Sequence, residues 1–102
     1  MSKSVTTIDP IHPGEILRED FLDAHNLSAT AFAKRLGVPA NRITRIIAGN
    51  SSVTADTALL LSAAFDTSPE FWLNLQSRYD LECARQNTAI VEKAKSIDII
   101  AA

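Results

Sequence analysis

The chain has little of the residues that interrupt or cross-link regular structure. Its 102 residues include three Gly, four Pro and one Cys. So few breakers favour helices. The lone Cys83 excludes an internal disulfide, and with two widely separated His residues it makes a poor metal site, so we expect a buried structural thiol. No apolar run approaches the roughly 18 residues of a membrane span. The N-terminus also lacks a basic region followed by an apolar run, and we expect a cytoplasmic protein.

Positive charge is not in excess over the whole chain, whose formal net charge is −2. This balance argues against nucleic acid, since phosphate contacts need local positive potential. The distribution is uneven, however. Residues 26–55 contain no acid and four cations, namely Lys34, Arg35, Arg42 and Arg45, while all 12 acids lie elsewhere. The segment is either a basic surface or a chance acid-free run on a solvated face, and its place in the fold decides between them.

What the sequence does contain is a series of helix signals that predict an all-α fold. The length fits one domain, and 46% hydrophobic residues is typical of a globular protein. Five helices are expected, starting at Pro13, after the caps Ser28, Thr54 and Ser68, and after Pro39. They should end near Asn26, Gly37, Gly49, Phe65 and Asn87. We therefore divide the chain into a flexible N-terminal arm (1–10), a five-helix domain (11–87) and a C-terminal tail (88–102).

Two short helices on either side of Gly37 form the motif that predicts a function. Ala33 is small where the helices would cross, and Ile43 and Ile46 recur at core-facing positions. A short helix, a turn with Gly and a second helix with a polar outer face make a helix-turn-helix, whose second helix enters the major groove of DNA. Because the motif lies inside the acid-free segment, we favour the basic-surface interpretation.

Three stretches of this motif and its flanks resemble a known family. They are Ile11-His12-Pro13-Gly14-Glu15-Ile16-Leu17, Leu36-Gly37-Val38 and Arg42-Ile43-Thr44-Arg45-Ile46, and they resemble the HigA, or VapI-type, antitoxins of the lambda-repressor-like superfamily. The similarity covers roughly residues 11–86. The resemblance implies a five-helix domain that dimerises, represses its own operon at an inverted repeat in double-stranded DNA, and neutralises a RelE-like mRNA-cleaving toxin, HigB.

The resemblance also implies positions of contact with DNA. The start of the second helix, at Ser28, Ala29 and Thr30, would lie against phosphate, with Lys34 and Arg35 adding charge. Residues expected to face the groove are Ala40, Asn41, Arg42, Thr44 and Arg45. Arg binds guanine O6 and N7, Asn pairs with adenine, and the methyl groups of Ala and Thr contact thymine. Asn50 and Ser52 would reach phosphate from the following loop.

Each assignment has an alternative that the residues leave open. Ser28 is either a phosphate contact or simply a cap, and Arg45 either contacts a base or packs its stem on the domain beside an acid. Thr30 and Thr44 either contact DNA or face solvent. The acidic cluster Glu19-Asp20-Asp23 is either a solvated face or a surface for a basic toxin.

Dimerisation is expected because a single small module binds a half-site weakly. Leu75, Tyr79, Ile97 and Ile99 offer apolar surface for it. The alternation of Ser96-Ile97-Asp98-Ile99 leaves the tail open between a short strand and a helix at the dimer interface.

Three functions remain open: an autorepressing antitoxin, a stand-alone regulator without a toxin, and a protein-interaction module that has lost DNA binding. An enzyme is not expected. The sequence has no phosphate-cradling Gly loop, no paired acid and base, and no ligands at metal spacing. We expect no cofactor.

Overall fold

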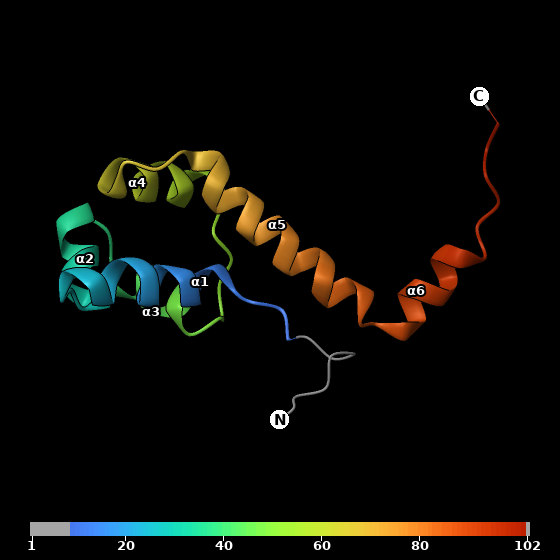
Figure 1. Cartoon of the computed structure of the whole chain (residues 1–102), viewed down its shortest axis with the longest axis horizontal. Coiled ribbons are helices and arrows are strands. Elements are labelled where there is room, and N and C mark those ends of the chain that lie inside the picture. Colours follow the sequence, from blue (N-terminus) through green and yellow to red (C-terminus); the bar gives the residue numbers. More distant parts are fainter. Residues whose placement is uncertain (1–8, 102) are drawn as a thin grey trace.

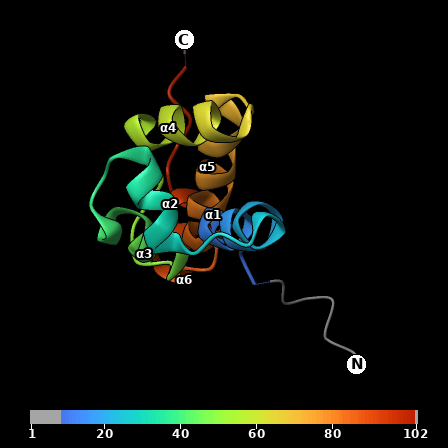
Figure 2. The same cartoon turned by 90° about the vertical axis from the view of Figure 1, so that its left-hand side faces the viewer.

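The computed structural model describes residues 9–101, which contain helices and no strand. In chain order the elements are α1 (Pro13–Ile16), η1 (Leu17–Leu22), η2 (Asp23–His25), α2 (Ala29–Leu36), α3 (Ala40–Ile47), α4 (Ala55–Phe65), α5 (Pro69–Arg85) and α6 (Thr88–Lys95). Helices α1 to α4 gather around the first part of α5, whereas the end of α5 and α6 lead away from them (Figures 1 and 2). The prediction of an all-α helix-turn-helix fold is confirmed. No helix within these residues is both long and apolar enough to cross a membrane.

The predicted caps set the boundaries of α2, α4 and α5. The hydroxyls of Ser28, Thr54 and Ser68 each accept a hydrogen bond from the backbone N–H three residues later, at 3.0, 3.4 and 3.1 Å. These bonds satisfy N–H groups that have no partner inside the helix. Helix α3 starts after Pro39, its N-cap, as expected, and ends at Ile47, two residues before the expected Gly49.

The first predicted helix combines three kinds of helical turn. A short α-helix, α1, is followed by the π-helix η1 and the 3-10 turn η2, and Asn26 ends the segment in the left-handed conformation with φ +52°. A π-helix closes its hydrogen bonds over five residues, which brings Leu17 and Leu22 onto one side. Both side chains are fully buried. The wider turn therefore directs two leucines, five residues apart, into the same core.

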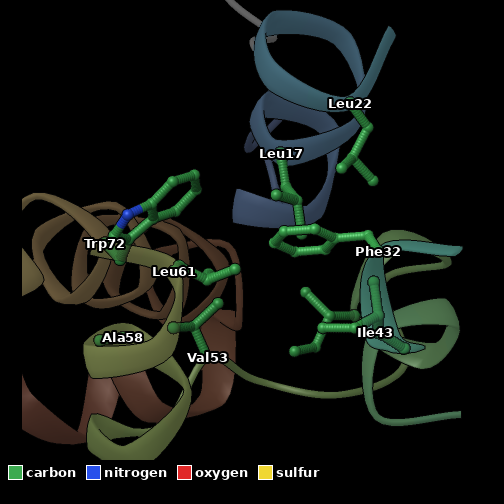
Figure 3. Close-up of a cluster of buried hydrophobic side chains, with 10 residues drawn as sticks. Leu17, Leu22, Phe32, Ile43, Val53, Ala58, Leu61 and Trp72 are labelled. Carbon is green, nitrogen blue, oxygen red and sulfur yellow. The ribbon is translucent and has the colours of Figure 1, made fainter. Parts of the chain in front are cut away.

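The core lies between α1–η1, α2–α3 and α4–α5. Leu17, Phe32, Ile43, Leu61 and Trp72 converge there from different elements, as Figure 3 shows. The indole N–H of Trp72 donates to the hydroxyl oxygen of Thr67 at 2.8 Å, so the one polar atom of this buried ring is satisfied. The first half of α5 thus packs into the domain and fixes α4 beside α2.

The C-terminal part of the chain contains the helix that is one of the two alternatives for the tail, and it corrects one expectation about the end of α5. Residues 88–95 form helix α6, capped by Asn87, and residues 97–101 form no strand, since a strand needs a partner strand and the single chain offers none there. Cys83 is exposed, so the prediction of a buried thiol is wrong. Its turn of α5 lies beyond the packed part of the domain. Residues 1–8 of the predicted arm (1–10) lie outside the described residues. The predicted domain limits stay predictions.

Candidate nucleic-acid interface

Helices α2 and α3 form a helix-turn-helix whose turn depends on Gly37. This residue ends α2 with φ +77°, a left-handed conformation that glycine adopts without a steric cost. The N–H of Val38 then donates to the carbonyl of Ala33 at 3.0 Å, which closes the turn. Ala33, Ile43 and Ile46 are buried between the two helices, as predicted from their spacing.

Gly14 brings α1 against the end of α3. A methyl group at this position would overlap the carbonyl oxygen of Ile46, so no other residue fits without moving a backbone. His12 caps α1 from the same junction, because its Nδ1 accepts the Gly14 N–H at 2.9 Å. This close approach fixes where α3 lies relative to the rest of the domain.

The outer surface of this unit is polar and cationic. The exposed residues among those predicted to contact DNA are Ser28, Thr30, Lys34, Arg35, Ala40, Asn41, Thr44, Arg45, Asn50 and Ser52. Within residues 9–101 the ion pairs formed by basic side chains involve Arg18, Arg78 and Lys95, and none of the four cations of residues 26–55. The acid-free segment therefore forms a basic surface whose charge is not neutralised by neighbouring carboxylates.

Two predicted contact residues are half-buried. Ala29 packs its methyl group against the core. Arg42 leans toward α4, where its Nε–H donates to the hydroxyl oxygen of Thr57 at 3.3 Å. The Ser28 hydroxyl caps α2, because it accepts the Ala31 N–H at 3.0 Å. Arg45 is exposed and pairs with no acid within residues 9–101, so the acid-paired alternative finds no support.

The loop after α3 is fixed from α5. The side-chain oxygen of Gln76 accepts the Val53 N–H at 2.7 Å, and its amide nitrogen donates to Asp80 at 2.9 Å. Gln76 is buried, and both of its side-chain polar atoms are hydrogen-bonded, one of them to the loop. Between this loop and α3 lies a hollow of about 430 Å³, lined by Pro39, Asn41, Arg42, Arg45, Ile46, Ser51, Ser52, Thr54 and Thr57. It opens beside the exposed face of α3.

The four residues predicted at the dimer interface lie in two different settings. Leu75 is half-buried against the core. The Tyr79 ring packs edge-on against the His12 ring, with 4.8 Å between the ring centroids. Ile97 and Ile99 are 65% and 96% exposed. The tail residues are thus the ones with apolar surface left uncovered.

Sequence reasoning did not single out Gly14, Thr57 or Gln76. Each acts through a residue far away in the chain, since Thr57 lies 15 residues from Arg42 and Gln76 lies 23 residues from Val53. Thr57 follows the cap Thr54 by three residues, which marks it as part of a helix start but gives no sign of its arginine partner. Only the fold brings these pairs together.

The α2–turn–α3 unit and its polar outer face are those of a helix-turn-helix protein. In proteins of this class the second helix presents a polar face to the major groove. Residues 17–72 match the helix-turn-helix family HTH_3, and the chain belongs to that family.

Known relatives agree with the resemblance to HigA and VapI-type proteins. Virulence-associated protein I of Dichelobacter nodosus is 49% identical over 77 residues, which cover 76% of this chain and 71% of that protein. Antitoxin HigA-1 of Vibrio cholerae is 39% identical over 72 residues, or 71% of this chain and 68% of that one. The structure of antitoxin HigA of Pseudomonas aeruginosa with the higBA promoter has a TM-score of 0.82 and 39% identity, covering 90% of this chain and 99% of that one.

These relationships confirm the resemblance to HigA and VapI-type proteins, and the relatives named are DNA-binding regulators and antitoxins, not enzymes.

Proposed function

We propose that this protein is a sequence-specific DNA-binding antitoxin that, as a dimer, represses the operon encoding it and its toxin. The observation that carries the proposal is the cationic face of α2 and α3, which forms no ion pair within residues 9–101, in a domain of helix-turn-helix architecture. The HigA relative solved with promoter DNA supports the same mode of binding. The proposal places the protein in the cytoplasm, where operator DNA lies.

Contacts with DNA divide into two kinds. The start of α2, with Ser28, Ala29 and Thr30, offers backbone N–H groups and a helix dipole to phosphate, while Lys34 adds charge. Asn50 reaches phosphate from the loop after α3. The groove-facing set on α3 is Ala40, Asn41, Arg42, Thr44 and Arg45. In this set the arginines select guanine, Asn41 selects adenine, and the methyl groups meet thymine.

A second copy of the chain completes the binding unit. The Cα radius of gyration is 16.9 Å, against about 13 Å for a compact domain of this length, because α6 and the tail project outward. Helix α6 has no buried residue, and Ile90, Ile97 and Ile99 are at least half exposed. Apolar surface of this kind supports an interface formed by the end of α5, with Leu75 and Tyr79, together with the tail. Two α3 helices would then read half-sites about one DNA turn, or roughly 34 Å, apart.

The proposed protein partner is a toxin of the HigB type, a RelE-like enzyme that cleaves mRNA. The antitoxin names of the relatives support this partner. We do not assign its contact to the acidic cluster of η1 and η2. Arg18 pairs with Glu19 at 3.0 Å and with Asp23 at 3.7 Å, which favours the interpretation of this cluster as a solvated face.

DNA binding is tested by mobility shift of the purified protein on the DNA upstream of its own gene, over a salt series and against random DNA. We expect specific binding that weakens steeply with salt. Binding no tighter than to random DNA would refute the repressor and favour the protein-interaction module.

The toxin is tested separately by expressing the product of the adjacent gene with and without this protein. Growth arrest and mRNA cleavage that this protein relieves would support the antitoxin. Specific DNA binding beside a harmless neighbour would instead leave a stand-alone regulator.

A further inference from the structure

Arg42 is held in a way that the other cations of the basic surface are not. It is half-buried, while Lys34, Arg35 and Arg45 are exposed. Its Nε–H donates to Thr57 Oγ1 at 3.3 Å, and Thr57 is only 2% exposed. A flexible side chain of α3 is therefore tied to the first turn of the next helix, α4.

Thr57 is itself held in place by Thr54. The Thr54 hydroxyl accepts the Thr57 N–H at 3.4 Å and donates to Thr57 Oγ1 at 3.3 Å. Thr57 Oγ1 thus receives hydrogen bonds from both Thr54 and Arg42. The cap of α4 and the orientation of Arg42 belong to one connected set of hydrogen bonds.

The acceptor that holds Arg42 is neutral. No carboxylate lines the hollow beside α3, whose polar lining consists of hydroxyls, one amide and two guanidinium groups. A carboxylate partner would orient an arginine but also offset its charge. A threonine hydroxyl orients it and leaves the full positive charge for DNA.

Because Nε is already occupied, the free donors of Arg42 are the N–H groups on its two Nη atoms. Guanine presents O6 and N7 as a pair of acceptors in the major groove. The planar guanidinium can meet such a pair either through Nε and one Nη, or end-on through both Nη atoms. Only the end-on arrangement is compatible with the bond to Thr57.

We propose that Thr57 is a positioning residue for sequence recognition, which aims Arg42 so that its two Nη groups contact one guanine end-on. This inference rests on the proposed function and adds to it the residue that sets base preference without itself reaching DNA. Thr57→Val removes the hydroxyl while keeping the shape of the side chain, and should release Arg42.

The experiment measures binding of the full chain to the DNA upstream of its own gene and to versions with each base pair replaced in turn. With Thr57→Val we expect discrimination at one G·C pair to fall about tenfold, with discrimination elsewhere and the salt slope unchanged. Thr57→Ser, which keeps the hydroxyl, should retain the full discrimination at that G·C pair. Ser62→Ala removes another hydroxyl of α4, one that bonds to Leu59 O away from Arg42, and is the matched control.

A double-mutant cycle separates positioning from a general structural effect. Arg42→Ala should abolish discrimination at the same base pair, and adding Thr57→Val to it should cost nothing more. Replacing the guanine by 7-deazaguanine, which lacks the N7 acceptor, should make the unsubstituted protein and Thr57→Val bind alike. If Thr57→Val does not fold, Thr57→Ala takes its place in the cycle.

Two results would overturn the inference while leaving the proposed function intact. One is undiminished discrimination by Thr57→Val, and the other is an additive loss in the double mutant. An unsubstituted protein with no preference for its upstream DNA would overturn both.

Discussion

His12 connects three parts of the molecule through one imidazole ring. Its Nδ1 accepts the Gly14 N–H at the start of α1, its ring packs edge-on against Tyr79 of α5, and it hydrogen-bonds the backbone of Ser51 in the loop after α3. Burial lowers the pKa of His12, against the smaller raising effects of the Ser51 backbone and of the negative charges of Asp80 and Glu15. The folded protein therefore favours the neutral ring.

This preference predicts a pH-dependent stability. Below the usual His pKa of 6.5 the unfolded chain binds a proton that the folded chain binds less readily. The contribution of His12 to the free energy of unfolding is thus complete above pH 6.5 and is lost as the pH falls through the lowered pKa. Urea unfolding at pH 7.5 and 5.5 measures the loss. His12→Asn, which can cap without titrating, should reduce it, and equal losses in both proteins would contradict the assignment.

Lys34 tests the phosphate side of the interface. It is exposed in the last turn of α2 and pairs with no acid within residues 9–101. Lys34→Ala should weaken binding to all DNA sequences alike and lower the slope of log affinity against log salt by about one. Mobility shifts on promoter and random DNA over a salt series give both values. Arg18→Ala on η1, an exposed cation outside both the DNA-facing surface and the proposed dimer surface, is the control. A selective loss of promoter binding by Lys34→Ala would instead make Lys34 a base contact.

At the scale of the elements, the placement of α3 depends on its contact with α1. Gly14→Ala adds a methyl group that overlaps the Ile46 carbonyl, so α1 and α3 must separate. We expect a loss of about 1–3 kcal/mol in unfolding free energy, although alanine is the better helix former. Gly37→Ala finds open space but keeps φ +77°, so it measures backbone strain alone. Calorimetry compares the two, and unchanged stability of Gly14→Ala would refute the close approach.

The elements show where sequence reasoning succeeds and where it stops. The caps Ser28, Thr54 and Ser68 are predictable because each acts on an N–H three residues away. The π-helix η1 is not, since its wider turn is favoured by the core that Leu17 and Leu22 must enter together. Local signals therefore locate helices, while packing decides their detailed form.

The candidate site follows the same division. The acid-free segment and the Gly37 turn predict a basic helix-turn-helix surface, and the exposed side chains of α3 agree. The bond between Arg42 and Thr57 joins two helices across a loop, and no pattern in the sequence marks it. The prediction that Cys83 is buried is wrong because apolar residues continue along α5 past the point where the domain offers a surface to pack against.

The whole molecule has a second region, α6 and the tail, whose removal tests the dimer. Truncation after Asn87 should weaken self-association in sedimentation and lower promoter affinity. The truncated domain should still fold, because α6 has no buried residue. In the full chain, replacing Ile97 and Ile99 with Ser measures what the tail contributes to self-association while α6 stays in place. A truncated chain that sediments as a full dimer would place the interface elsewhere.

Helix α5 links the DNA-facing half of the domain to the surface proposed for the second copy. It is 17 residues long, a rod of roughly 25 Å. In a two-fold dimer built at its far end, the length of this rod sets how far apart the two α3 helices stand. The protein would then act as a ruler, whose fixed span accepts operators of one half-site spacing and rejects those with a few base pairs inserted between the halves.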